Sequence, residues 1–193
     1  MKDKQILDEF RTSGALLEGH FKLSSGRHSG HYLQCARVLM NPARAARLAE
    51  ALLARIPDDI RADIQLVVSP AMGGIIIGHE MGRALGKDAI FLERPTGTFE
   101  ARRGFAIESG VKVLMVEDVV TTGLSSREAI AAVRRTGGKV IAEAALVDRS
   151  NGSTDLGVPF YPLISIDFPT YAQDEVPPKL AALPVTKPGS RSA

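Results

Sequence analysis

The chain has 193 residues, which is enough for one domain with a full hydrophobic core and too few for two domains of ordinary size. Apolar residues make up 45% of it and charged residues 24%, and no apolar run approaches the roughly 18 residues of a membrane span, so the composition excludes membrane-spanning and disordered proteins. Lysine and arginine number 24 against 22 aspartates and glutamates, and a net charge of +2 gives no general case for nucleic-acid binding; any anion site must be a local arrangement.

The N-terminal segment and the cysteine content bear on the cellular location. The opening MKDKQILDEF has acidic residues where a secretory signal would need an apolar core. Cys35 is the only cysteine, so neither a disulfide framework nor a cysteine-based metal site is available. We expect a cytoplasmic protein.

Segments of helical period alternate with short apolar runs along the chain. Apolar side chains share one face over residues 4–13, and Gly14 then ends the predicted helix. Asn41 and Pro42 are a cap and a first-turn proline for a second helix, and a glycine-rich turn opens a third that Gly86 ends. Predicted strands cover residues 65–70, 89–93, 111–117, 139–148 and 160–166.

Strands that are apolar on both faces and separated by helices imply a parallel sheet covered on two sides, so the predicted fold class is α/β. We expect one domain over residues 1–193, with a Pro-rich appended tail at 176–193. In such a sheet, ligands bind beyond the carboxyl ends of the strands. That rule directs attention to residues 69–74, 116–126 and 147–152, and to the polar segment 93–105.

The segment VEDVVTTG, residues 116–123, combines features of an anion site with two acids. Thr121, Thr122, Gly123 and Ser125 offer hydroxyls and a permissive backbone just ahead of a predicted helix, whose N–H groups and positive end attract an anion. The alternative is a turn that only caps the helix, because Ser125-x-x-Glu128 matches a capping box.

Glu117 and Asp118, which precede this turn, would repel a phosphate that touched them. Carboxylates are, however, natural acceptors for a diol and natural partners for a divalent metal that bridges to further phosphate. A sugar phosphate satisfies both halves of the motif.

The stretch VLMVEDVVTTG resembles the phosphoribosyl pyrophosphate (PRPP) signature of the type I phosphoribosyltransferases. Residues 19–34, 69–78, 146–149, 167–171 and 187–191 are similar, in order and spacing, to the shorter bacterial members of the orotate phosphoribosyltransferase family, so the resemblance covers nearly the whole chain. It implies a mostly parallel central sheet with helices on both faces, a small N-terminal hood over residues 1–40, and a homodimer whose active site is shared across the interface.

The reaction that the resemblance implies is transfer of the 5-phosphoribosyl group from PRPP to N1 of orotate. The products are orotidine 5′-monophosphate and diphosphate, in the de novo synthesis of UMP. Mg²⁺ is the implied cofactor, held mainly through PRPP, with Glu117 or Asp118 as candidates to contact it through water.

The family's PRPP-binding roles carry over onto matching positions here. Glu117 and Asp118 would hold the ribose 2- and 3-hydroxyls, and the turn at residues 121–125 would hold the 5-phosphate. The turn 71–74 would bind the diphosphate through backbone N–H groups. The implied PRPP-binding residues are Met72, Gly73, Arg94, Glu117, Asp118, Val119, Val120, Thr121, Thr122, Gly123, Leu124 and Ser125.

The implied orotate-binding residues are Thr121, Arg149 and, in the hood, Ser25, Gly26 and Tyr32. A guanidinium suits a planar carboxylate because two parallel N–H bonds fix its orientation. Arg149 could instead make a surface salt bridge, and Tyr32 could be an ordinary half-buried tyrosine. The three hood histidines, His20, His28 and His31, have no carboxylate at ligand spacing, so we expect no metal there.

The chain departs from the longer members of the family at two places. The longer members carry lysines at the positions of Ser24 and Gly73. Their mobile catalytic loop also has lysines and a histidine, whereas the matching residues 93–105 have neither, and their only basic residues are Arg94, Arg102 and Arg103. We hypothesise that Arg102 or Arg103 closes over the leaving diphosphate, from the same subunit or its partner. The alternative is that these arginines are solvated charges on a flexible loop. With Asp118, Arg102 and Arg103 are the residues expected to be catalytic.

Two other functions remain open. A PRPP-sensing regulator that binds DNA would need a winged helix or a strongly basic face, for which 193 residues at +2 leave little room. A purine phosphoribosyltransferase would not need Arg149 or the hood segment LSSGRHS.

Overall fold

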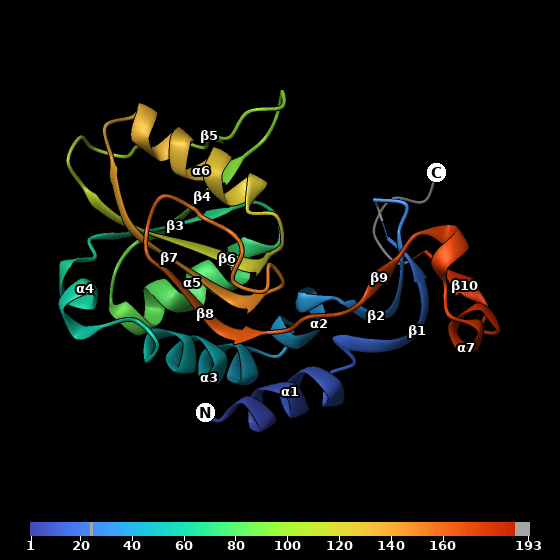
Figure 1. Cartoon of the computed structure of the whole chain (residues 1–193). Coiled ribbons are helices and arrows are strands. Elements are labelled where there is room, and N and C mark those ends of the chain that lie inside the picture. The colour runs from blue at the N-terminus through green and yellow to red at the C-terminus, as the bar shows by residue number, and fades with distance from the viewer. Residues whose placement is uncertain (24, 188–193) are drawn as a thin grey trace.

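The computed structural model describes residues 1–23 and 25–187, and these form two sheets. The larger sheet has the order β5-β4-β3-β6-β7-β8 (Figure 1). Strands β4, β3, β6, β7 and β8 run parallel to one another, and β5 is antiparallel to β4. The bounds are β3 Leu66–Pro70, β4 Ala89–Glu93, β5 Glu100–Ala101, β6 Lys112–Val120, β7 Lys139–Asp148 and β8 Phe160–Ser165.

Helices cover both faces of this sheet, as the α/β prediction requires (Figure 1). In β6, Leu114 and Val116 pack into a core with α3 (Pro42–Leu53) and α5 (Gly74–Leu85), while Val113 and Met115 pack into a second core beneath α6 (Leu124–Arg135). This strand is therefore buried on both sides, which explains its unbroken apolar run. The remaining helices are α1 Asp3–Thr12, α2 Cys35–Leu39, α4 Asp58–Asp63, η1 Gln173–Glu175 and α7 Pro178–Ala181.

Local sequence signals position most of these elements. The Asn41 side chain accepts a hydrogen bond from the Arg44 N–H at 3.0 Å and starts α3 as predicted. Gly86 ends α5 in the left-handed conformation, with φ at +63°. The strand β7 covers the predicted residues, whereas β6 continues to Val120, so both acids of the signature lie within a strand.

The alternative interpretation of Ser125 and Glu128 as a capping box is wrong. The N-cap is Gly123, in the left-handed conformation, and it makes no side-chain capping bond. The Glu128 carboxylate instead pairs with Arg94 on the loop after β4. No acidic side chain therefore caps the first turn of α6.

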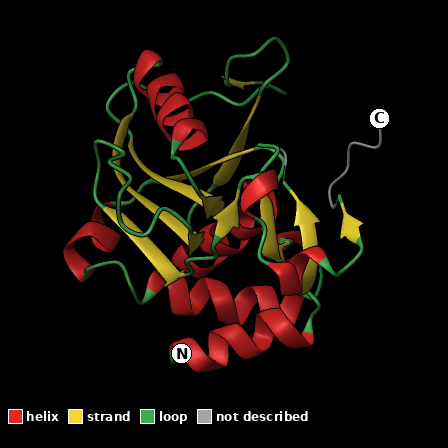
Figure 2. Ribbon diagram, turned by 45° about the vertical axis from the view of Figure 1, so that its right-hand side comes forward, coloured by secondary structure: helices red, strands yellow, loops and turns green. Residues whose placement is uncertain are grey.

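The smaller sheet, which we call the hood sheet, has the order β10-β1-β2-β9 and stands apart from the larger one (Figures 1 and 2). Its strands are β1 Leu16–Lys22, β2 His28–Leu33, β9 Thr170–Tyr171 and β10 Val185–Thr186. The prediction that the C-terminal segment is an appended tail is wrong at β10, because this strand pairs with β1 and joins the hood sheet. The edge of β1 offers unpaired backbone groups to which a short strand can bind. Ser24 and residues 188–193, which include most of the segment 187–191, lie outside the described residues.

Within the described residues, no helix combines the length and the apolarity needed to cross a bilayer.

Candidate functional site

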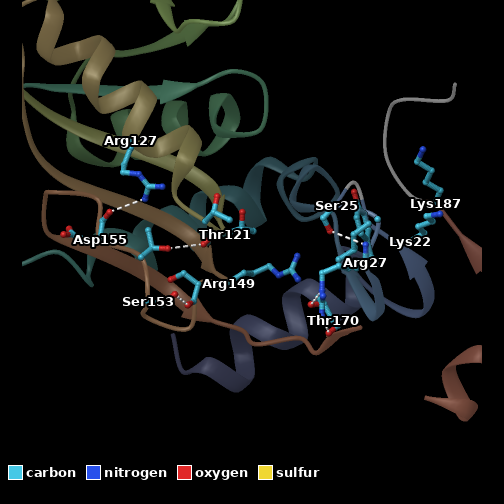
Figure 3. A pocket seen from close by; sticks show the side chains of 16 residues that line it. Lys22, Ser25, Arg27, Thr121, Arg127, Arg149, Ser153, Asp155, Thr170 and Lys187 are labelled. Carbon is cyan, nitrogen blue, oxygen red and sulfur yellow. Dashed lines mark hydrogen bonds between the residues drawn. The ribbon is translucent and has the colours of Figure 1, made fainter. Parts of the chain in front are cut away.

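A cleft of about 1270 Å³ separates the hood sheet from the carboxyl ends of the larger sheet (Figure 3). A smaller hollow of about 380 Å³ lies next to it, and Thr121 and Thr122 line both. The smaller hollow brings together ten predicted residues, namely Gly73, Glu117, Asp118, Val119, Val120, Thr121, Thr122, Gly123, Leu124 and Ser125. The larger cleft contains all the residues predicted for the base, namely Ser25, Gly26, Tyr32, Thr121 and Arg149.

The turn between β6 and α6 has the geometry of an anion site. Gly123 takes φ +71°, and a Cβ there would lie 2.7 Å from a Leu156 methyl group, so both conformation and space require glycine. The Thr154 hydroxyl donates to the Thr121 carbonyl at 3.1 Å and braces the turn. Gly123, Leu124, Ser125 and Ser126 line the smaller hollow, so the positive end of α6 lies at this hollow.

The two acids at the end of β6 are held in a partly dehydrated setting. Burial raises the pKa of Glu117 to about 9, and the nearby negative charges of Asp118 and Glu143 add to the rise. Burial also raises the pKa of Asp118, although the Val119 N–H donates to its Oδ1 at 2.9 Å and opposes the rise. A protonated Glu117 can both donate and accept hydrogen bonds, which suits it to a hydroxyl group.

Gly73 lies directly against Asp118. A Cβ at Gly73 would be 2.6 Å from Asp118 Oδ1, so any side chain at this position would displace the carboxylate or the turn. The neighbouring Ala71–Met72 peptide is cis, and the Met72 side chain is 83% exposed and lines neither hollow. The close packing gives a physical reason why this chain carries glycine at position 73.

Arg149 follows β7 and points across the cleft toward the hood loop (Figure 3). Its Nε is buried without a hydrogen-bond partner, and no ion pair within the described residues involves its guanidinium, so the salt-bridge alternative is wrong. Burial lowers the pKa of Arg149, while Asp167 and Tyr32 oppose the shift. A buried donor without a partner is costly, which favours a ligand that accepts from it.

Sequence reasoning missed several residues of the cleft. Arg27 binds Thr170 twice, through Nε to the hydroxyl at 2.9 Å and through a terminal nitrogen to the carbonyl at 2.7 Å, and so ties the hood loop to β9. Arg127 on α6 donates to the Asp155 carbonyl at 3.3 Å. Arg27 could have been predicted, because it belongs to the hood segment LSSGRHS, whereas no sequence motif pointed to Arg127. Lys22, Leu23, Ser150, Ser153, Thr154 and Lys187 complete the lining.

The loop arginines are not brought to either hollow within this chain. Arg103 pairs with Glu93 at 2.8 Å and lies 5.9 Å from the Phe91 ring, because β5 folds back on β4. Arg94 lies 4.2 Å over the Phe99 ring, in addition to its pair with Glu128. Arg102 lines neither hollow. Phe99, which was not predicted, reaches the smaller hollow instead.

The hood histidines interact with each other and with aromatic rings. His20 Nε2 and His28 Nδ1 are 2.7 Å apart in the interior of the hood sheet, and His31 stacks on Phe168 at 4.6 Å. Across the part of the chain that the structure describes, no group of three histidine, cysteine, aspartate or glutamate side chains is placed to hold a metal ion.

The fold and the site define a phosphoribosyltransferase. The phosphoribosyl transferase domain family matches residues 36–173, and the chain belongs to that family. Its fold is the type I phosphoribosyltransferase fold, as the sequence predicted.

Curated relatives place it more narrowly. The chain is 72% identical over its full length to the orotate phosphoribosyltransferase of Erythrobacter litoralis, covering 100% of both chains, and 72% identical to that of Novosphingobium aromaticivorans, covering 99% of the latter. The crystal structure of orotate phosphoribosyltransferase from Aeropyrum pernix matches with a TM-score of 0.72 and 26% identity, over 83% of this chain and 93% of that one.

Proposed function

We propose that this cleft transfers the 5-phosphoribosyl group of PRPP to N1 of orotate, so that the chain is an orotate phosphoribosyltransferase. The observation that carries the proposal is that the turn at Thr121 and Thr122 and the side chain of Arg149, which suit anions of different kinds, line one cleft. The turn at Thr121 and Thr122 suits a phosphate, and across from it Arg149 presents a buried, unpartnered Nε to a planar carboxylate. The full-length relatives at 72% identity support the same substrate pair.

The sugar phosphate would lie along the carboxyl end of β6. The 5-phosphate accepts hydrogen bonds from the N–H groups and hydroxyls of residues 121–125, and Glu117 and Asp118 bind the ribose hydroxyls. The helix end contributes only about 0.3–1 kcal/mol, or roughly 2 kcal/mol when partly buried, so the hydrogen bonds supply most of the affinity. A Glu117 that is neutral near pH 7 also reduces repulsion toward the anionic substrate.

The acceptor base would lie between Tyr32 and the end of β7. Two parallel N–H bonds from Arg149 fix both the position and the orientation of the orotate carboxylate. That orientation aims N1 at ribose C1 beside Thr121, so a bimolecular reaction becomes effectively unimolecular.

The leaving diphosphate would lie on the turn 71–74, where Gly73 allows close approach of the backbone. As its bond to ribose C1 loosens, C1 gains cationic character and the departing oxygens gain negative charge. Backbone N–H groups of the turn stabilise that charge, and Asp118, packed against Gly73, lies next to the cationic centre.

Mg²⁺ fits this site as an ion carried by the substrate. The described residues provide no cluster of three ligands, and Mg²⁺ is commonly held by one or two carboxylates together with substrate phosphates. Glu117 and Asp118 are the residues that would contact it through water. When bound, the ion supplies Lewis-acid stabilisation of the diphosphate oxygens.

We further propose that the protein is a cytoplasmic homodimer and that Arg102 or Arg103 of one subunit reaches the diphosphate of its partner. The support is their position directly after β5, in the same segment as Phe99, which lines the smaller hollow. Alanine at each position should lower kcat/KM, and a value within about two-fold of the parent for both variants would refute the role.

The direct test of function follows the ultraviolet absorbance of orotate with PRPP and Mg²⁺. Orotate is expected to disappear only when PRPP is present, with orotidine 5′-monophosphate as product. Adenine and hypoxanthine serve as competing acceptors. Consumption of a purine without loss of orotate would overturn the proposal.

A further inference from the structure

Two lysines of the cleft, Lys22 and Lys187, have no part in the function proposed above. Strands β1 and β10 pair in parallel, with His20 opposite Val185 and Phe21 opposite Thr186. Lys22 and Lys187 are the next residues along the chain after Phe21 and Thr186. Continuing that register by one residue places Lys22 beside Lys187. Both line the cleft, on the hood side (Figure 3).

The C-terminal segment that delivers Lys187 is fixed at two points. The Thr186 hydroxyl donates to the His20 carbonyl at 3.2 Å, and His20 Nδ1 lies 3.3 Å from the Leu183 carbonyl oxygen. These contacts join the segment to β1 on both sides of Val185. The position of Lys187 beside Lys22 is therefore a consequence of strand pairing.

Like charges in adjacent positions of paired strands repel one another. Within the described residues, neither Lys22 nor Lys187 makes an ion pair. The described lining also carries Arg27, Arg127 and Arg149 against a single acid, Asp155. A cleft lined by one sign of charge concentrates ligands of the opposite sign.

The anion that these lysines face follows from the layout of the two hollows. Ala71 and Gly73, from the turn that would hold the diphosphate, line the smaller hollow, and neither lysine does. The 5-phosphate would bind at the N-terminus of α6. The remaining anion is the carboxylate-bearing base, whose residues Tyr32 and Arg149 line the same cleft as the lysines.

We propose that Lys22 and Lys187 form a cationic subsite for the acceptor base, so that the C-terminal strand β10 belongs to the orotate-binding site. The pair attracts the anionic base into the cleft and holds it on the hood side, opposite Arg149. This inference rests on the proposed function, because it requires orotate to bind in this cleft.

The test measures steady-state rates of the full chain against orotate at saturating PRPP, and against PRPP at saturating orotate. Lys22→Gln and Lys187→Gln should each raise the KM for orotate about five-fold, while kcat and the KM for PRPP stay within about two-fold. The rise should shrink as ionic strength increases, and Lys187→Arg should restore the parent value. Lys179→Gln, on α7 in the same C-terminal segment and outside the cleft, is the matched control and should behave as the parent.

An unchanged KM for orotate in both glutamine variants would overturn the inference, as would a rise in the KM for PRPP in its place. Arg149→Gln, measured in parallel, separates this failure from failure of the proposed function. If only Arg149→Gln raises the KM for orotate, the lysine subsite is wrong and the base site stands. If Arg149→Gln also leaves that KM unchanged, the base does not bind in this cleft and both are wrong.

Discussion

Replacing Gly73 by alanine tests the packing of the diphosphate turn against Asp118. The added Cβ would lie 2.6 Å from Asp118 Oδ1 and 2.7 Å from the carboxyl carbon, about 0.8 Å short of ordinary van der Waals contact. The carboxylate cannot turn away freely, since its Oδ1 accepts the Val119 N–H at 2.9 Å. Overpacking of this kind costs about 1–3 kcal/mol.

Part of that cost should appear as displacement of Asp118 from the ribose and of the turn from the diphosphate. We expect kcat/KM for PRPP to fall roughly 10- to 100-fold, equivalent to about 1.4–2.7 kcal/mol of transition-state stabilisation. The KM for orotate should change much less. Initial rates with PRPP varied at saturating orotate give the answer.

Gly30→Ala is the matched control. A Cβ there would meet only a Leu180 methyl group at 3.9 Å, and the position lies outside both hollows. It should leave the kinetic constants unchanged. If Gly73→Ala also kept kcat/KM for PRPP within about two-fold of the parent, the close approach of Gly73 to Asp118 would have no role in binding or catalysis.

Three further predictions concern buried acids and the hood. Because Glu117 has a pKa of about 9 in the folded chain and 4.5 ordinarily, the native state holds more protons between these values, and stability falls as pH rises through that window. Glu117→Gln should flatten this fall in a plot of Tm against pH; an unaltered slope would contradict the assignment. Glu143, which is fully buried with both carboxylate oxygens unpartnered, has a pKa of about 7, so Glu143→Gln should flatten only the part between about pH 4.5 and 7. Arg27→Ala releases the hood loop from Thr170 and should raise the KM for orotate about three- to ten-fold, and an equal effect on the KM for PRPP would speak against a role confined to the hood.

The elements that the sequence predicted well are those whose signals are local. The strand over residues 139–148 was recognisable because both of its faces are buried, and α3 and α5 were bounded by Asn41 and Gly86 through capping chemistry. The residues of the smaller hollow were predictable for a similar reason, since most of them are contiguous in one motif at the end of one strand.

The features that escaped prediction depend on contacts between distant segments. Lys187 enters the cleft only because β10 pairs with β1, more than a hundred residues away along the chain, and a proline-rich composition does not reveal that pairing. Arg103 pairs with Glu93 because β5 folds back on β4. The partnerless Nε of Arg149 likewise follows from burial, which no local pattern encodes.

A crystal structure of the protein with PRPP, Mg²⁺ and orotate bound together tests the central claim most directly. Density for the 5-phosphate should lie in the turn 121–125, the ribose hydroxyls should lie within hydrogen-bonding distance of Glu117 and Asp118, and the orotate carboxylate should meet Arg149. A base bound elsewhere, or a sugar whose hydroxyls face away from these two acids, would contradict the account.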